Sequence, residues 1–459
     1  MTDRLTLERF AAQGRAIARV DGKAVLVDRG IAGETVEVEV TQAEARFLVA
    51  RVVDVVTPSP DRVEPPCPHF AGCGGCDWQH VRYPAQVALK RQVVQEQLER
   101  LGGLTPPTDW AITPAVQPLE YRDKLEWVPV PTDAGWTVGF HGHPKADPVA
   151  VQRCWLGPET FSAIAHGAMA FLVAQAPRAP DKPIPPFGVT RLTVQGGHDV
   201  NGATAYALTL HVRGAKQVDA IAAIGTKLRE RVRRDVPALT TVAVSAGDDA
   251  ERAGMLRVAS GDGALYRHVG ALRYPVPLDA FFQVNPEQAQ GLVAYVSDQF
   301  ARHLPAKGAP RVFDLFCGAG LFTIPLLQAG YTVAGAEVSR AAIKSAGRVA
   351  QAVDVTSDGF RVMDLDRPEA LRNLVREFGH PAAILVDPPR RGLAPRLAAD
   401  LVTTAPSLLV YVSCDPGTFA RDAKKLAERF TLAELRGFDV FPQTHHLELV
   451  GTFLRRQGT

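Results

Sequence analysis

The sequence predicts an α/β protein built of three parts: a small β-barrel, a mostly β central domain, and a doubly wound parallel sheet. Three observations support this division. Short alternating strands with glycine turns occupy residues 1–60, β-type alternation prevails within 61–272, and strand and helix patterns alternate across 273–459. With 459 residues, the chain is also too long for a single ordinary core.

The composition narrows the class of protein. Hydrophobic residues make up 46% of the chain and charged residues 22%, which is typical of a folded globular protein and excludes a disordered one. The net charge of +2 permits a nucleic-acid partner without requiring one. No apolar stretch reaches membrane-spanning length, and the first residues lack an apolar signal region. We therefore expect a cytoplasmic protein without a membrane partner, whose six cysteines are ligands or nucleophiles rather than disulfides.

The first sixty residues form a unit of short strands at 16–20, 24–27, 35–40 and 47–53. Asp21-Gly22 is one of the turns between them. Strands this short and this evenly spaced indicate a small closed barrel of the oligonucleotide-binding type. The pattern alone leaves two roles open, a structural module and an RNA-binding module.

A cysteine cluster follows this unit. Cys67, Cys73 and Cys76 are separated by five and two residues on glycine-rich backbone, and Cys154 lies far downstream. Four thiolates can hold either a tetrahedral zinc ion or an iron–sulfur cluster. The alternative is a set of buried cysteines that act as small hydrophobic residues. Spacing does not decide between zinc and iron.

Two helical patterns lie in the middle of the chain. Residues 81–102 read as an amphipathic helix that ends at glycine and can pack on the C-terminal domain. The basic run 227–234 also has helical spacing, and we interpret it as a solvated helix face without assigning it a function.

The C-terminal part begins with a nucleotide-type cofactor loop. The segment 311–320 reads as a strand that runs into a glycine-rich turn with Gly318 and Gly320, and 321–327 then opens a helix. The next strand, 333–337, ends in Glu337, where a carboxylate can accept hydrogen bonds from both hydroxyls of a ribose. This arrangement fits S-adenosylmethionine or a dinucleotide.

The dinucleotide interpretation is the weaker one. Its full glycine fingerprint requires a third glycine where this chain has Thr323. A further strand ends at Asp387, in the motif Asp387-Pro-Pro-Arg390, and is expected to face the same crevice.

A nucleophile and an acid complete the pattern. Cys414 directly follows the buried strand 407–413, so its thiol is expected on the ligand-binding edge of the sheet. Glu448 lies further downstream. A cofactor loop, a thiol and a carboxylate outline a covalent group-transfer enzyme, in which the thiol needs a lowered pKa. We interpret Cys317 as core packing and assign no role to His445 and His446.

Together these features resemble a known family, the S-adenosylmethionine-dependent RNA uridine-5-methyltransferases, and within it the iron–sulfur branch that acts on large-subunit (23S) ribosomal RNA. The N-terminal unit resembles a TRAM domain. The motifs that carry the resemblance are Cys67-Pro-His-Phe, Cys73-Gly-Gly-Cys76, Tyr121-Arg-Asp-Lys124, Phe281-Phe-Gln-Val-Asn285, Asp314-Leu-Phe-Cys-Gly-Ala-Gly320, Asp387-Pro-Pro-Arg390, Ser413-Cys-Asp-Pro416 and Phe441-Pro-Gln-Thr-His-His-Leu-Glu448.

The resemblance implies a role for each site residue. Cys414 would be the nucleophile that adds to C6 of uracil, and Glu448 the base that removes the C5 proton. The cysteine set would hold a [4Fe-4S] cluster, with zinc as the alternative, and the partner would be RNA bound by a monomer. The residues implied to hold S-adenosylmethionine or the target base are Gln283, Phe316, Gly318, Gly320, Leu321, Glu337, Asp364 and Asp387, and those implied to hold the cluster are Cys67, Cys73, Cys76 and Cys154.

Two positions depart from the family pattern. Leu321 stands where related sequences often carry a polar residue, so its cofactor contact would be apolar or through the backbone. Asp123 replaces the asparagine of the family's Tyr-Arg-Asn-Lys motif, which leaves the role of that motif open.

Several alternative functions remain. A transfer-RNA uridine methyltransferase and an RNA cytosine-5 methyltransferase would use the same covalent logic. An amino-directed methyltransferase would carry an aromatic residue after Asp-Pro-Pro, where this chain has Arg390. A non-catalytic RNA-binding metal protein is the alternative from a different class.

Overall fold

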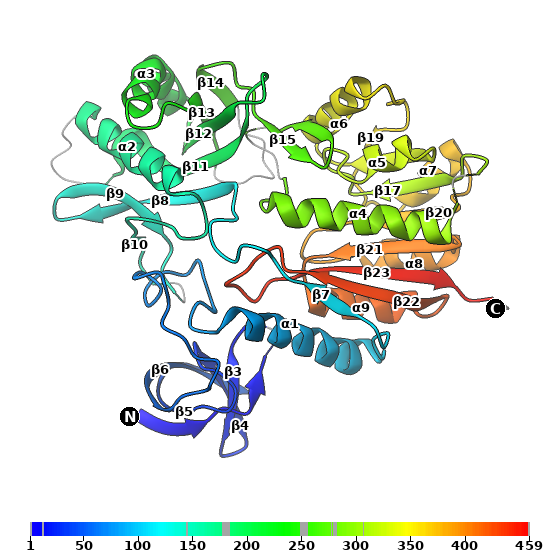
Figure 1. Cartoon of the computed structure of the whole chain (residues 1–459), viewed down its shortest axis with the longest axis horizontal. Coiled ribbons are helices and arrows are strands. Elements are labelled where there is room, and N and C mark those ends of the chain that lie inside the picture. Colours follow the sequence, from blue (N-terminus) through cyan, green and yellow to red (C-terminus); the bar gives the residue numbers. More distant parts are fainter. Residues whose placement is uncertain are drawn as a thin grey trace.

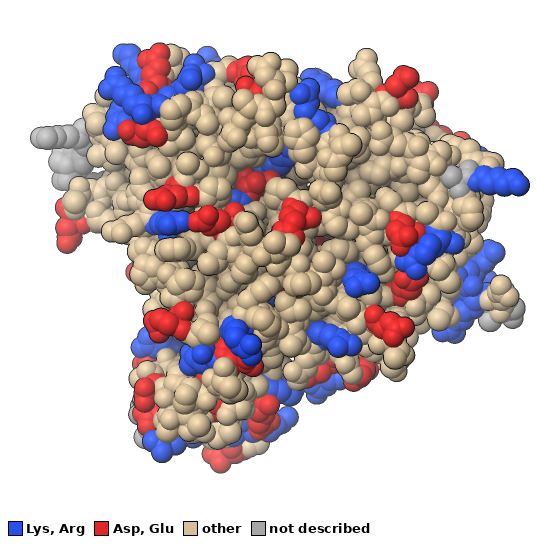
Figure 2. All heavy atoms as spheres, in the orientation of Figure 1, with Lys and Arg blue, Asp and Glu red and all other residues tan. Residues whose placement is uncertain are grey.

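Three β-sheets divide the chain in the order that the sequence predicts (Figure 1). The computed structural model describes residues 2–11, 13–143, 146–176, 184–247, 256–276, 278, 282–305 and 307–457. None of the helices within these ranges is long and apolar enough to cross a membrane. On the face shown in Figure 2, Lys and Arg are mixed with Asp and Glu, in keeping with the small net charge.

The N-terminal sheet curls into a barrel-like unit, with the hydrogen-bonded order β1-β5-β6-β4-β3-β2. It has an apolar core that includes Val27 and Val36, and its strand β1 reaches β3 across the curl. The hydrogen-bonded ladder nevertheless stays open between its end strands, because β2 is short and the chain then turns away, where Gly14 O accepts a hydrogen bond from Trp78 Nε1 at 2.8 Å. The strands are β1 (Thr2–Thr6), β2 (Arg9–Phe10), β3 (Ala16–Val20), β4 (Lys23–Asp28), β5 (Thr35–Ala43) and β6 (Phe47–Thr57).

The central sheet is mixed, and two long helices pack on it (Figure 1). The mostly β pattern predicted for this region is therefore incomplete. The first helix was missed because its sequence is apolar on most faces, which hides the helical period. The second contains most of the basic run 227–234 and connects the parallel pair β12 and β13. The elements are β8 (Lys124–Thr132), β9 (Gly135–Phe140), β10 (Val149–Ala150), α2 (Glu159–Gln175), β11 (Val189–His198), β12 (Thr204–Val212), α3 (Ala215–Arg233), β13 (Leu239–Ala246), β14 (Leu256–Ser260), β15 (Tyr266–Val269) and β16 (Leu272–Pro275).

The C-terminal sheet has the order β19-β18-β17-β20-β21-β23-β22-β7. Its first five strands are parallel, as predicted, but β23 runs antiparallel between β21 and β22, so the sheet is mixed rather than all parallel. The elements are α4 (Pro286–His303), β17 (Arg311–Leu315), α5 (Thr323–Gln328), β18 (Thr332–Glu337), α6 (Arg340–Ala352), β19 (Arg361–Val362), α7 (Ala370–Phe378), β20 (Ala383–Val386), α8 (Pro395–Thr404), β21 (Leu408–Ser413), α9 (Pro416–Leu426), β22 (Phe430–Phe438) and β23 (Glu448–Arg455).

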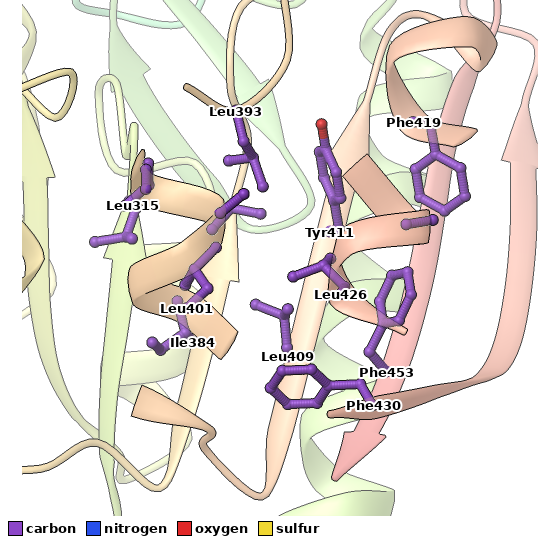
Figure 3. Packing of buried hydrophobic residues seen from close by; sticks show 14 of the residues in the cluster. Leu315, Ile384, Leu393, Leu401, Leu409, Tyr411, Phe419, Leu426, Phe430 and Phe453 are labelled. Atoms are coloured by element: carbon purple, nitrogen blue, oxygen red, sulfur yellow. The ribbon is translucent and has the colours of Figure 1, made fainter. Parts of the chain in front are cut away.

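Helices cover both faces of this sheet because its strands are apolar on both sides. Successive residues of β21 belong to opposite cores: Leu409 and Tyr411 pack under α8 and α9, whereas Val410 packs under α4. Figure 3 shows the first of these cores, with Phe419 and Phe453 beside Tyr411. The buried sheet thus provides a rigid base for the loops at its carboxyl edge.

One early segment joins this C-terminal unit. Helix α1 (Tyr83–Gln97) packs on α9, and strand β7 (Ala111–Thr113) pairs in parallel with the edge strand β22. This docking was predicted for the helix, but β7 was assigned to the central region. A buried ion pair between Lys90 Nζ and Asp439 Oδ1, 2.6 Å apart, secures the helix. The chain therefore uses residues from its first quarter to complete the C-terminal sheet.

Candidate active site

The glycine-rich loop after β17 is shaped by left-handed backbone conformations. Phe316, Gly318 and Gly320 have φ angles of 66°, 53° and 83°. Gly320 also has no room for a larger residue, because a Cβ there would lie 3.1 Å from Ile324 and 3.2 Å from Ala346. The loop can therefore turn sharply and bring its backbone close to a bound ligand at the carboxyl edge of the sheet.

Three carboxylates meet beside this loop, each at the carboxyl end of a neighbouring parallel strand. Asp314 lies on β17, Glu337 ends β18 and Asp387 follows β20. Glu337 accepts hydrogen bonds from the backbone N–H groups of Gly318 at 3.3 Å and Ser339 at 2.8 Å. It thus ties the two loops together at the position predicted to face a ribose.

The carboxylates of this edge are destabilised in the ligand-free chain. Burial, with the nearby charge of Glu337, raises the pKa of Asp314 to about 7. Burial and the charges of Asp314 and Glu337 raise the pKa of Asp387 to about 8. Asp314 Oδ1 is buried without a hydrogen-bond partner among the described residues. Such a site favours a cationic ligand, because a positive charge would relieve both the repulsion and the desolvation.

Cys414 lies at the loop where β21 ends and α9 begins. Burial raises the pKa of its thiol to about 12, helped by the negative charges of Glu448 and Asp387 and opposed by the charge of Arg390. The expected lowering of the pKa is therefore absent in the ligand-free chain. The thiol becomes a thiolate only when the surrounding charge changes, for example when a cation binds at the acidic edge.

Glu448 reaches the same place from an antiparallel strand. It is the first residue of β23, and the register of this strand pairs Leu449 with Ser413 of β21. The next position along both strands places Glu448 beside Cys414. The carboxyl group is almost fully buried, and burial, followed by the charge of Asp387, raises its pKa well above the ordinary value. A buried carboxylate of this kind is a stronger base than an exposed one.

Gln283 lies in a loop that is bonded through its backbone to the segment containing Asp123. Its side chain is buried, and its Oε1 atom has no partner in the described part of the chain, as expected of a group that meets a ligand. The carbonyl of its neighbour Val284 accepts a hydrogen bond from the Asp123 backbone N–H at 2.9 Å. Phe281, which belongs to the same sequence motif, lies outside the described residues.

The Asp123 departure has a structural explanation. Its carboxylate forms an ion pair with the buried Arg267, with Oδ2 2.8 Å from Nε. Arg267 also donates to the Asp123 carbonyl at 2.9 Å and to the Gly196 carbonyl at 3.1 Å. Burial raises the pKa of Asp123 to about 7 and the charge of Arg267 opposes this rise, so the carboxyl group can supply a counter-charge to Arg267 that a neutral asparagine lacks.

The remaining predicted cofactor residues lie at the rim of the same edge. Leu321 is half-buried among apolar side chains, and its carbonyl accepts a hydrogen bond from the Tyr274 hydroxyl at 3.3 Å. This agrees with an apolar or backbone contact. Asp364 follows β19, and its side chain is 45% exposed, which leaves its carboxylate accessible. Cys317 is buried below the loop, where it was predicted to contribute to the core.

A further group of residues, which contact one another beside the predicted site, was not identified from the sequence. Arg390 NH2 lies 3.0 Å from His446 Nε2, and the His445 and His446 rings are 4.1 Å apart. His445 Nδ1 lies 2.6 Å from Asp77 Oδ2, in the segment just after Cys76. Histidines in a turn are common, so only the tertiary contacts identify these as part of the site.

The four predicted cluster ligands line one cavity of about 290 Å³. Its lining also includes Arg122, from the Tyr-Arg-Asp-Lys motif, and Phe282 and Val284, which flank Gln283. Hydrogen bonds already point at two of the sulfur atoms: Gln79 Nε2 donates to Cys76 Sγ at 3.1 Å, and Gly75 N to Cys73 Sγ at 3.4 Å. Cys67, Cys73, Cys76 and Cys154 therefore all contribute to the lining of this cavity, and their role as ligands of one metal centre stays a prediction.

The described side chains of this cavity do not by themselves show a metal centre. Within the described ranges, no three His, Cys, Asp or Glu side chains are close enough to hold a single metal ion. Burial raises the pKa of all four thiols, and binding to a metal requires them to be deprotonated. Arg29 and Arg122 lie close enough to lower the pKa values of neighbouring thiols, and they would offset the negative charge of a four-thiolate centre.

Comparisons with known proteins agree with this geometry. Residues 2–53 match the TRAM domain, and residues 268–457 match the family described as tRNA (Uracil-5-)-methyltransferase. A solved structure, the Pyrococcus abyssi tRNA (uracil-54, C5)-methyltransferase in complex with S-adenosyl-L-homocysteine, has a TM-score of 0.74 at 23% identity and covers 98% of this chain and 99% of its own, which shows a shared fold.

Two curated relatives are similar along almost their whole length. An uncharacterized RNA methyltransferase from Nitratidesulfovibrio vulgaris is 31% identical, over 98% of this chain and 95% of its own. The 23S rRNA (uracil(1939)-C(5))-methyltransferase of Pseudomonas entomophila is also 31% identical, over 98% and 93%. The chain therefore belongs to the family of RNA methyltransferases that transfer the methyl group of S-adenosylmethionine to C5 of uracil.

Proposed function

We propose that the protein methylates a uridine of 23S ribosomal RNA, with Cys414 as nucleophile and Glu448 as base. The observation that carries the catalytic assignment is the antiparallel register of β21 and β23, which sets the thiol beside the carboxylate at the acidic edge of the sheet. A second thiol, that of Cys317, also lies at this edge near the buried Asp314, but Cys317 is buried within the glycine-rich loop whereas Cys414 is only partly buried.

Addition of a thiolate is the first chemical step. Uracil C5 is a weak nucleophile until Cys414 Sγ adds to C6, which moves the C5–C6 electron pair to C5 and O4 as an enolate. C5 then attacks the methyl carbon of S-adenosylmethionine, the carbon–sulfur bond breaks, and its electron pair stays on the sulfur of S-adenosylhomocysteine. The positive charge of the sulfonium also suits the destabilised carboxylates at Asp314 and Asp387.

Elimination completes the reaction. The Glu448 carboxylate removes the C5 proton, the electron pair of the C–H bond re-forms the C5–C6 double bond, and the C6–sulfur bond breaks to release the Cys414 thiolate. The proton then passes from Glu448 to solvent. The raised pKa of Glu448 supports this role, because a carboxylate with a high pKa binds the abstracted proton firmly.

Residues of the acidic edge and its loops hold the cofactor in this proposal. The backbone around Gly318 and Gly320 approaches S-adenosylmethionine, Glu337 accepts hydrogen bonds from the ribose hydroxyls, and Asp387 faces the positive end of the cofactor. The remaining contacts, to the cofactor or the target base, are assigned to Gln283, Phe316, Leu321 and Asp364.

The cysteine cavity holds a [4Fe-4S] cluster in this proposal. The four cysteines that line a cavity of about 290 Å³ and the two nearby arginines support a four-thiolate centre, and the resemblance to the iron–sulfur branch favours iron over zinc. When bound, the cluster would cross-link the cysteine loop to the central domain, and methyl transfer needs no electron from it. Anaerobically purified protein should be brown and contain iron and acid-labile sulfide; active, colourless protein with stoichiometric zinc would contradict the proposal.

The choice of 23S ribosomal RNA is supported by the ribosomal relative at 31% identity. Transfer RNA is the second candidate, because the solved structure with a TM-score of 0.74 is a transfer-RNA enzyme. A ribosomal substrate would place the protein in the cytoplasm, and we expect it to act as a monomer. Mass-spectrometric mapping of 5-methyluridine in RNA from a deletion strain decides between the two: the modification should disappear from 23S RNA and persist in transfer RNA.

The catalytic assignment has a direct test with 5-fluorouridine RNA, whose fluorine cannot be removed by a base. The native protein should form a stable covalent adduct with this RNA, and Cys414→Ala should form none and transfer no methyl groups. Glu448→Gln should accumulate covalent complex with ordinary RNA, because addition and methylation proceed while elimination stalls. Native turnover by either variant would refute the assignment, whereas methyl transfer by the native protein that is lost in Cys414→Ala would exclude the non-catalytic RNA-binding alternative.

A further inference from the structure

The cysteine loop is connected to the catalytic loop by a chain of side-chain contacts. Asp77, the residue after Cys76, accepts a hydrogen bond from His445 Nδ1 at 2.6 Å and another from the His445 backbone N–H at 3.2 Å. In return, the backbone N–H of Asp77 donates to the Gln443 carbonyl at 2.9 Å. Asp77 thus joins its own segment to the distant segment 443–445 through both its side chain and its backbone.

His445 is held from the opposite side as well. Gly14, in the N-terminal domain, lies directly against it: a Cβ at this glycine would come within 2.8 Å of His445 Cβ. The Trp78 indole closes the contact by donating to the Gly14 carbonyl at 2.8 Å. His445 therefore has little freedom to move, and its ring in turn packs against His446 with centroids 4.1 Å apart.

His446 connects this fixed histidine to Arg390 at the active site. Its Nε2 lies 3.0 Å from Arg390 NH2, and because a guanidinium can only donate, the Nε2 atom must accept and the imidazole must be neutral. Burial, with the charges of His445 and Arg390, holds the pKa of His446 at about 3, which agrees with a neutral ring. The ring also packs edge-on against Phe441.

Arg390 supplies the positive charge near the catalytic pair, Cys414 and Glu448. The groups that face Cys414 are Glu448, Asp387, Asp415 and Arg390, and only the last of these lowers the pKa of the thiol. Arg390 also opposes the rise in the pKa of Glu448. If the guanidinium swung away, the acidic groups of Glu448, Asp387 and Asp415 would face the thiol without a compensating positive charge, and formation of the thiolate would become harder.

We propose that His446 is a positioning residue that holds the Arg390 guanidinium near Cys414, and that Asp77 fixes His446 through His445. This inference rests on the proposed roles of Cys414 and Glu448 and extends them. It also gives the cysteine loop a task at the active site, because the residue next to Cys76 orders the arginine that favours the nucleophile.

The test uses three full-length variants: His446→Leu, His446→Gln and Asp77→Ala. The pH dependence of iodoacetamide alkylation at Cys414 is followed by mass spectrometry of its peptide, together with the rate of adduct formation on 5-fluorouridine RNA. His446→Leu should shift the alkylation midpoint to higher pH and slow adduct formation about 10- to 100-fold, the factor expected for loss of a hydrogen bond to a charged group. His446→Gln, whose amide oxygen can accept from Arg390, should recover most of the rate.

Asp77→Ala should reproduce the His446→Leu shift at Cys414, with iron content checked so that variants that lose metal are compared at equal occupancy. His380→Gln, at an exposed histidine that contacts the Thr404 carbonyl, is the control and should behave like native protein. An unchanged alkylation midpoint and adduct rate in His446→Leu, or no recovery in His446→Gln, would overturn the inference. Failure of the proposed function looks different, because native protein itself would then form no adduct at Cys414.

Discussion

Replacing Asp387 with asparagine should remove a fall in the free energy of unfolding that the protein shows, without added cofactor, as the pH rises. The carboxyl group has an ordinary pKa of 3.8 and a folded-state pKa of about 8, because it is buried beside Asp314 and Glu337. A group whose pKa is raised by folding stabilises the folded state fully below its unfolded pKa, and this contribution is lost as the pH rises through the folded pKa.

The magnitude follows from proton binding. Between about pH 6 and pH 8 the unfolded chain keeps Asp387 ionised, whereas the folded chain still holds most of one proton there, so the free energy of unfolding falls by about 2 kcal/mol. For a domain of roughly 200 residues this corresponds to a fall in Tm of about 4–8 °C. Asp387→Asn should lose this part of the pH dependence and be the more stable protein at pH 8.

Differential scanning calorimetry across this pH range measures the effect. S-adenosylmethionine should flatten the pH dependence of the native protein, because its positive charge favours the ionised carboxylate, and it should stabilise Asp387→Asn much less. Asp298→Asn, which changes an exposed carboxylate on α4, is the control and should retain the native profile. Identical pH profiles for native protein and Asp387→Asn would refute the reasoning.

Three further predictions concern other parts of the molecule. Lys90→Met should lower the free energy of unfolding by about 3–5 kcal/mol in urea titrations, because it leaves Asp439 buried without its partner; an equally stable variant would contradict the role of this ion pair. Gly320→Ala should weaken S-adenosylmethionine binding about 5- to 30-fold, as measured by calorimetry, which is the equivalent of about 1–2 kcal/mol of backbone strain. Gly347 has open space for a Cβ atom, so Gly347→Ala is the control and should bind the cofactor normally. Cys73→Ser should lose iron and acid-labile sulfide and bind RNA less tightly, with S-adenosylmethionine affinity changed less than about threefold; equal loss of both affinities would contradict separate roles.

Local sequence patterns were sufficient for the parts of the fold that depend on near neighbours. Strand 383–386 is a continuous apolar run because both of its faces are buried, and it occurs in the structure where the pattern places it. The glycine turn at Gly318 and Gly320 was equally readable, because left-handed backbone is a property of the residue type. Patterns failed where they lack a period, as in α2, whose apolar residues surround the helix.

The pKa values of buried groups and the contacts between distant segments could be determined only from the tertiary structure. The sequence placed Cys414 and Glu448 in one domain, but only the antiparallel insertion of β23 shows that they are neighbours. The thiol was expected to have a lowered pKa, yet burial among carboxylates raises it, because a pKa depends on every charge within several ångströms.

The residue types in the sequence were enough to indicate the chemistry of the site. The contacts that position its reactive groups form only when the chain folds. A thiol, a carboxylate and a glycine-rich loop can be recognised from the sequence because each function requires particular atoms. The roles of Asp77, His446 and Arg390 could not be recognised in this way, because a positioning role is defined by a partner rather than by the residue itself. Contacts between segments more than 300 residues apart exist only once the sheets have assembled, and so they were decided by the tertiary structure alone.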